Sequence, residues 1–199
     1  MTEITIRTFV NLALQKEFAA NEIDNAIIAA LNDLTKFNLL TATSPAEFAK
    51  VDGDNTLDLP ADFKKVISIT PTAGSGVQTE ALLPIPGGFK EYKQWNANNN
   101  VNFRSTPQYF VKHADKMYFW PTLNASFTFE MEYYKNHAQS TATIEFGSDF
   151  TNAVNFGAAY YAALFRKQMT YVSVWRQIYT EERGFMIRMN PPQPSVIGA

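Results

Sequence analysis

The chain has 199 residues, of which 46% are hydrophobic and 14% aromatic, so it can bury the core of one large domain or two small ones. It has no cysteine, which excludes a disulfide scaffold and a thiolate metal site, and its net charge of −2 argues against a basic surface dedicated to nucleic acid. No apolar run approaches the roughly 20 residues that span a bilayer, and the first residues carry no secretion signal, so we expect no membrane association.

Charge is unevenly distributed along the chain. Residues 1–63 carry four basic and ten acidic side chains, whereas residues 64–199 carry thirteen basic and nine acidic ones. This asymmetry is consistent with complementary surfaces on neighbouring copies of the chain. It is also consistent with ordinary solvated faces, which is the interpretation we favour from the sequence.

The first forty residues have the spacing of two helices. The first is expected over residues 4–18, with one apolar stripe made by Ile6, Val10, Leu14 and Phe18. The second is expected to start after Asn21, which is a good N-cap, and to end before residues 41–45. Its acidic first turn suits the positive end of the helix dipole.

From about residue 46 the hydrophobic period changes from 3.6 to 2, which is typical of strands. Residues 47–51 and 56–60 flank a turn signal at 52–55 and are expected to pair as a hairpin. Further strands are expected at residues 64–71, 107–113, 116–121 and 126–134, and a short helix is expected within residues 86–100. In the last of these, Phe127, Phe129, Met131 and Tyr133 share one face.

Helical spacing returns near the end of the chain. Residues 149–168 are apolar nearly all round, which predicts a deeply buried helix. Residues 172–190 form a second helix, with Val174, Ile178, Phe185 and Met189 on a stripe. The proline-rich residues 191–199 are expected to be extended.

The order of elements predicts an α+β fold. The N- and C-terminal helix pairs are expected to form a four-helix bundle-like domain, into which an antiparallel β-sandwich is inserted. The expected parts are residues 1–44 and 147–190 for the helix pairs, 45–146 for the β domain, and 191–199 for the tail.

No motif for catalysis or metal binding stands out. The only histidines, His113 and His137, have no second ligand at metal-binding spacing, and the glycines at 74–76 and 87–88 fit no phosphate-binding loop. The acidic residues Asp52, Asp54, Asp58 and Asp62 are better explained by a hairpin turn than by a calcium loop. We therefore predict no enzyme activity and no cofactor.

Two surface hypotheses remain open. Trp95, Trp120, Tyr133 and Tyr134 could form a stacking platform for a sugar or a single-stranded nucleic acid, although aromatic residues at strand positions are more often core. Residues 88–116 are locally basic, which would suit DNA or an acidic neighbour.

The order of several segments resembles a known family. These segments are "IIAALNDL", "LDLPADFKKVISI", "TPQYFVKHADKMYFWPTLNASFTFEMEYYK" and "DFTNAVNFGAAYYAAL". Together, over about residues 20–170, they resemble the head-to-tail adaptor (connector) proteins of tailed bacteriophages, especially short-tailed ones.

The resemblance implies a structural virion protein that is made in the host cytoplasm and located in the neck or tail. Such adaptors form a ring, typically a dodecamer, below the portal protein, extend the DNA channel without binding DNA specifically, and present a surface to the tail or nozzle protein. The residues that would bind the portal are Pro191, Pro192, Gln193, Pro194, Ser195, Val196 and Ile197. Contacts between subunits are expected from Phe156, Tyr160, Tyr161 and Trp175. The alternatives are another neck or tail-tube component, or a β-sandwich module that binds a glycan or another ligand and uses Trp95 and Trp120 for stacking.

Overall fold

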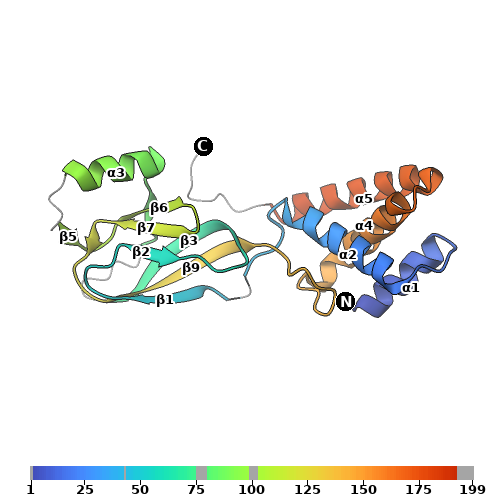
Figure 1. Cartoon of the computed structure of the whole chain (residues 1–199), viewed down its shortest axis with the longest axis horizontal. Helices are drawn as coiled ribbons and strands as arrows, with labels where there is room; N and C mark the ends of the chain where they lie inside the picture. The colour runs from blue at the N-terminus through green and yellow to red at the C-terminus, as the bar shows by residue number, and fades with distance from the viewer. Residues whose placement is uncertain (1, 43, 75–79, 99–102, 192–199) are drawn as a thin grey trace. The chain divides into compact units, whose positions relative to one another are not determined.

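The computed structural model describes residues 2–42, 44–74, 80–98 and 103–191. These residues fall into two compact units (Figure 1). A helical unit holds the described residues through Leu40 and those from Lys135 onward, and a strand-rich unit runs from Thr41 to Tyr134. Each unit has its own buried hydrophobic residues, so each is held together by its own packing.

The first helix, α1 (Glu3–Ala13), is shorter than the expected helix of residues 4–18. Thr2 caps its start, because the Thr5 N–H donates to the Thr2 hydroxyl. The chain leaves the helix at Gln15, whose φ of 50° is left-handed. The four residues of the predicted stripe, including Phe18 beyond the helix end, are nevertheless all buried.

The second helix, α2 (Ala20–Thr35), starts earlier than predicted. Its N-cap is Ala19, and Asn21 lies inside the first turn, so the prediction of Asn21 as the cap is wrong. The Glu22 carboxylate accepts a hydrogen bond from the Ala19 N–H at 3.0 Å. The acidic side chain thus stabilises the helix start in place of a polar cap.

Two long helices follow the strand-rich unit. They are α4 (Thr151–Phe165), which is preceded by the 3₁₀ turn η1 (Ser148–Phe150), and α5 (Met169–Met189). α4 packs against α1, α2 and α5. Its small residues permit close approach: a Cβ added at Gly157 would lie 2.8 Å from the Ala30 Cβ and 2.9 Å from the Tyr179 Cε2. α4 is therefore the central helix of the unit.

The expected four-helix bundle is wrong, although the mixed α+β composition is as predicted. The described residues contain five α-helices, and one of them, the expected short helix α3 (Gly88–Asn98), belongs to the strand-rich unit. In the helical unit α1, α2 and α5 pack around α4, whereas a bundle packs four equivalent helices around a shared core. The physical reason is the composition of α4, which is apolar nearly all round and is most stable at the centre.

Nine strands form three sheets in the described part of the strand-rich unit. The three-stranded sheet has the order β1 (Ala46–Lys50), β9 (Phe127–Lys135), β3 (Phe63–Gly74). The four-stranded sheet has the order β2 (Thr56–Asp58), β7 (Lys116–Trp120), β6 (Tyr109–His113), β4 (Leu83–Pro84), and the two-stranded sheet pairs β5 (Arg104–Ser105) with β8 (Thr122–Leu123). The Phe119 ring of β7 stacks on the Phe129 ring of β9 with 4.7 Å between centroids, so the two larger sheets share one core.

The expectation of a wholly antiparallel sandwich is also wrong. β4 pairs with β6, and β5 with β8, in parallel. The predicted hairpin of residues 47–51 and 56–60 does not form, because β1 pairs with β9 and β2 pairs with β7. In the turn between them the Gly53 N–H donates to the Leu123 carbonyl at 3.0 Å. This turn therefore carries the chain from one sheet to the other.

Other strand predictions are confirmed. β6 and β7 form the expected hairpin. The four residues predicted to share one face of β9 are all buried. The chain turns a corner at residues 59–62, between β2 and β3. The Tyr133 hydroxyl donates to Asp62 at 3.0 Å, and the Tyr133 ring stacks on the Phe63 ring with 5.7 Å between centroids. This corner thus fixes the entry of β3 into its sheet.

Candidate functional site

The outer side of α5 presents an apolar face, which we define as Val174, Ile178, Phe185 and Met189. Val174, Phe185 and Met189 are 51%, 45% and 63% exposed. The sequence predicts this stripe, but the residues that α5 buries in the core are others, namely Val172, Tyr179 and Met186. α5 therefore has one apolar face packed inside the unit and, on another side, an exposed stripe of apolar residues that also includes the exposed Glu181.

A polar network fixes the rotation of α5 about its own axis. The Tyr179 hydroxyl donates to Asp33 Oδ2 at 2.9 Å, and Arg183 Nη1 donates to the same oxygen at 2.5 Å. The Arg183 guanidinium also lies over the Phe37 ring, 4.6 Å from its centroid. Burial, followed by the nearby Asp33 charge, raises the pKa of Tyr179 above its ordinary value, and burial raises the pKa of Tyr161 to about 12. Because these bonds join α5 to α2, the exposed face of α5 cannot turn inward without breaking them.

A second exposed apolar face lies on α1, and we define it as Ile4, Thr8 and Leu12. Ile4 is 74% exposed and Leu12 is 78% exposed. The Thr8 hydroxyl donates to the Ile4 carbonyl at 3.0 Å, so its hydrogen is satisfied within the helix. This face carries no charged side chain.

The orientation of α1 is also fixed by polar contacts. Arg7 Nη2 lies 2.5 Å from Glu3 Oε1 and 2.6 Å from Asp24 Oδ1, which ties α1 to α2. The Thr141 hydroxyl donates to Glu3 at 3.0 Å. This hydrogen bond, and then the Arg7 guanidinium, lower the pKa of Glu3. The α1 face is thus held outward, as the α5 face is.

The four residues expected between subunits are half-buried inside the helical unit. Phe156 lies 5.8 Å from Phe9 and 5.9 Å from Trp175 between ring centroids. Tyr160 lies 4.9 Å from Tyr161. Each ring therefore already has partners within the chain, and only its outer part is open to solvent. Their role between subunits stays a prediction.

The predicted portal-binding tail is described only at its first residue. Pro191 is exposed after the end of α5. Pro192, Gln193, Pro194, Ser195, Val196 and Ile197 lie outside the described residues.

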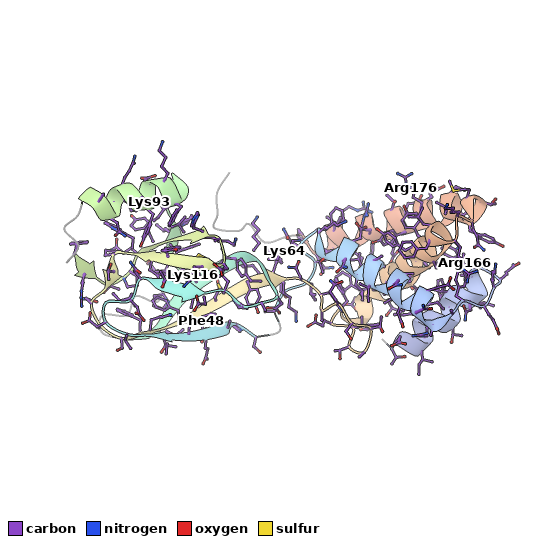
Figure 2. All side chains as sticks on the ribbon, in the orientation of Figure 1. Phe48, Lys64, Lys93, Lys116, Arg166 and Arg176 are labelled. Carbon is purple, nitrogen blue, oxygen red and sulfur yellow. The ribbon has the colours of Figure 1, made fainter. Side chains whose placement is uncertain are left out.

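The strand-rich unit does not gather the aromatic residues proposed as a platform. Trp95 of α3 and Trp120 of β7 do meet, 4.8 Å apart, but they are half-buried where α3 packs on the four-stranded sheet. Tyr133 and Tyr134 are buried elsewhere. Among the predicted basic residues, Lys93 is exposed on α3 (Figure 2). These positions favour a packing role for the aromatic residues.

The acidic residues of the turn and corner have structural partners. Asp52 pairs with Arg104 at 3.0 Å, and Asp58 pairs with Lys116 at 3.3 Å. Asp54 accepts the Val51 N–H at 3.2 Å. The described residues contain no group of three or more His, Asp or Glu side chains that could hold a metal ion.

The histidines are likewise engaged. The His113 ring stacks on Phe89 at 3.8 Å between centroids. His137 is buried, and its Nε2 accepts the Glu145 N–H at 3.2 Å. Both rings thus have packing or hydrogen-bonding roles in the structure.

Comparison with known protein families gives a match that covers most of the chain. The family model described as "SU10 adaptor protein" matches residues 1–193. No curated protein matches the sequence. In addition, no helix within the described ranges has the length and hydropathy needed to cross a membrane.

Proposed function

The chain belongs to the SU10 adaptor family of phage head-to-tail adaptor proteins, and from this we propose that it forms a ring below the portal of the filled capsid. As a family member it is a phage adaptor and a structural component of the virion. In the proposed role the ring, taken to be a dodecamer, extends the DNA channel. It also offers the surface to which the tail or nozzle protein attaches.

The observation that carries the proposal is the extent of the family match. It covers residues 1–193 and therefore includes both the helical and the strand-rich unit. The exposed apolar faces of α1 and α5 support it, since large apolar side chains exposed on rigid helices suit contacts between proteins. The outer parts of Phe156, Tyr160, Tyr161 and Trp175 would add to contacts between subunits.

The charge of the chain suits a passage for DNA. A net charge of −2 avoids the dense positive charge that would bind phosphates and hold the DNA in place. We propose that DNA passes through the ring without sequence-specific binding. Association would then be with the portal, with the tail and with further copies.

The segment of residues 191–197 is the proposed portal anchor. A chain truncated after Asn190 keeps both units of the fold, so it should fold normally but bind the portal at least about tenfold more weakly. Co-sedimentation with the purified portal protein of the same phage measures this, and the circular dichroism of the two chains checks folding. Unchanged portal binding of a folded, truncated chain would remove the anchoring role.

The ring itself is tested separately. The full-length protein is mixed with the portal protein, and the bound complex is imaged in the electron microscope. A closed ring of adaptor density on the portal is the expected result. A folded protein that never associates with the portal would contradict the proposed function.

A further inference from the structure

His137 is a buried histidine whose two ring nitrogens both have hydrogen-bond partners. The residue is 2% exposed and lies between β9 and η1. Its Nε2 accepts the Glu145 N–H at 3.2 Å, and because a backbone N–H can only donate, this nitrogen carries no proton. The proton of the neutral ring is therefore on Nδ1, which donates to the Ala138 carbonyl at 2.6 Å. The hydrogen bonds thus require the neutral form of His137.

These hydrogen bonds close a loop of the helical unit, which we name the strap and define as residues 136–146. The Glu145 carboxylate pairs with Lys135, just before the strap begins. The His137 ring lies parallel to the Phe146 ring with 6.1 Å between centroids, and Phe146 is buried in the core of the helical unit. The two ends of the strap are therefore joined at a buried position that includes His137.

The middle of the strap lies on the first two helices of the unit. Gln139 and Asn32 of α2 exchange two hydrogen bonds, at 2.9 and 3.2 Å. The Thr141 hydroxyl donates to Glu3 of α1 at 3.0 Å. These bonds are exposed or only partly buried, so each contributes little by itself. The strap therefore depends on its buried end, which contains His137.

The helices packed against the strap contribute two carboxylates, both at Thr141. The Thr141 hydroxyl lies 3.0 Å from Glu3 Oε2 and 3.4 Å from Asp24 Oδ1. Both carboxylates also pair with Arg7. The partners of these charges are thus Thr141 and Arg7, whereas both nitrogens of the His137 ring have backbone partners.

The charge next to His137 is the Glu145 carboxylate. Burial raises the pKa of Glu145, but the hydrogen bonds from Lys135 and from the Ala138 N–H outweigh burial and hold this pKa below its ordinary value. Glu145 is therefore ionised and paired with Lys135 at the mildly acidic pH, about 6.5, at which a histidine of an unfolded chain takes up a proton. In this range His137 is the group of the strap that can change its charge.

We propose that the strap is an acid-sensitive latch, which opens when His137 takes up a proton while the rest of the helical unit stays folded. Protonation places a hydrogen on Nε2, where it faces the Glu145 N–H, so two donors meet and the hydrogen bond between them is lost. Opening lets water accept from both groups. The stabilisation by the closed strap is thus fully present above about pH 6.5 and is lost as the pH falls below it.

The latch has a consequence for the connection between the two units. The chain passes from the strand-rich to the helical unit between Tyr134 and Lys135, directly before the strap. An open strap therefore adds free chain to this connection. The device belongs to the fold of one chain, so it does not rest on the proposed ring.

Nuclear magnetic resonance of the full-length protein tests the latch, because the chain has only two histidines, His113 and His137. Long-range ¹H–¹⁵N spectra report which ring nitrogens carry protons, and hydrogen exchange gives the protection factor of each amide. At about pH 7.5 we expect His137 to carry its proton on Nδ1. Between about pH 7.5 and pH 5.5 the protection of strap amides, including Glu145, should fall at least about tenfold, while α4 amides keep theirs.

His137→Gln is the matched variant, since a glutamine side-chain oxygen can accept the Glu145 N–H in place of Nε2 and does not titrate. Its strap should keep the same protection over the whole pH range. His113→Gln is the control, because His113 is exposed and stacks on Phe89 in the strand-rich unit. Its strap should respond to pH as the parent strap does.

Several results would overturn the proposal. They are a parent strap that stays protected down to about pH 5.5, whether the His137 ring is neutral or charged, an equal loss of protection in His137→Gln, and a loss in α4 that accompanies the loss in the strap. If His137→Gln does not fold, the parent decides: strap amides must lose protection at the pH at which the His137 ring takes up its proton. A loss at any other pH would contradict the latch.

Discussion

At the scale of single residues, a few side chains decide how the helical unit packs. Gly157 allows α4 to approach Ala30 of α2 and the Tyr179 ring of α5 at once. The Tyr179 hydroxyl in turn donates a hydrogen bond to Asp33, which lies 146 positions earlier in the sequence. The sequence shows small residues in this helix, but it does not show which of them lies at the closest approach. That depends on contacts between distant segments.

Gly157→Ala, which adds a methyl group, should lower the free energy of unfolding of the protein. The added Cβ would lie closer than 3.0 Å to both neighbours, and overpacking of this kind costs about 1–3 kcal/mol. Gly184→Ala in α5 is the control, since its nearest neighbour is the flexible end of Arg188 at 3.6 Å and alanine favours helices by up to ~1 kcal/mol. Urea denaturation compares the free energies of unfolding. Equal effects of the two substitutions would show that Gly157 is not a close-packing position.

Tyr179→Phe should make the free energy of unfolding fall less steeply as the pH rises into the alkaline range. Burial and the Asp33 charge raise the pKa of Tyr179 above its ordinary 10.0. Above pH 10 the unfolded chain loses this proton while the folded protein keeps it. The contribution of Tyr179 to the free energy of unfolding is therefore fully present below pH 10 and falls above it by up to ~1.4 kcal/mol per pH unit. Denaturant titrations from about pH 8 to pH 11 measure the slope.

The control for this experiment is Tyr171→Phe, a half-buried tyrosine earlier on the same helix. It should keep the slope of the parent protein. Parallel curves for the parent and Tyr179→Phe would contradict the assignment of the alkaline loss to Tyr179.

At the scale of elements, the sequence predicts most helices and strands but not which of their faces turn inward. α5 has two sets of apolar residues at helical spacing, and the buried set is selected by the ties of Tyr179 and Arg183 to α2. β1 and β2 have the pattern of a hairpin, yet each pairs with a strand far along the chain. Local pattern therefore identifies elements, whereas long-range contacts choose their partners.

α3 should depend on its aromatic contacts with the four-stranded sheet. Trp95 lies 4.8 Å from Trp120 and 5.4 Å from Tyr109 between ring centroids. Trp95→Ala removes these contacts, so backbone amides of α3 should exchange hydrogen at least about tenfold faster while those of β9 keep their protection. The exposed neighbour Gln94→Ala should leave the exchange of both elements unchanged. Uniform acceleration throughout the strand-rich unit would instead mean that α3 is not a local unit.

At the scale of the whole molecule, the order of helices, strands and helices is the feature most accessible from sequence. The family assignment follows from that order together with the match over residues 1–193. The bundle and the antiparallel sandwich were mispredicted because the central position of α4 and the parallel pairs of β4 and β5 arise from packing between distant segments. The apolar faces of α1 and α5 can be predicted from the sequence only in part, because the sequence shows which positions are apolar but not which of them are exposed.

Assembly of this adaptor as a ring on the portal is the core of the proposed function. Native mass spectrometry of the purified portal protein, alone and with a molar excess of the adaptor, measures this assembly. We expect one dominant complex that carries a fixed, ring-sized number of 22.4 kDa adaptor chains. A folded adaptor that stays monomeric with and without portal would rule out the proposed ring.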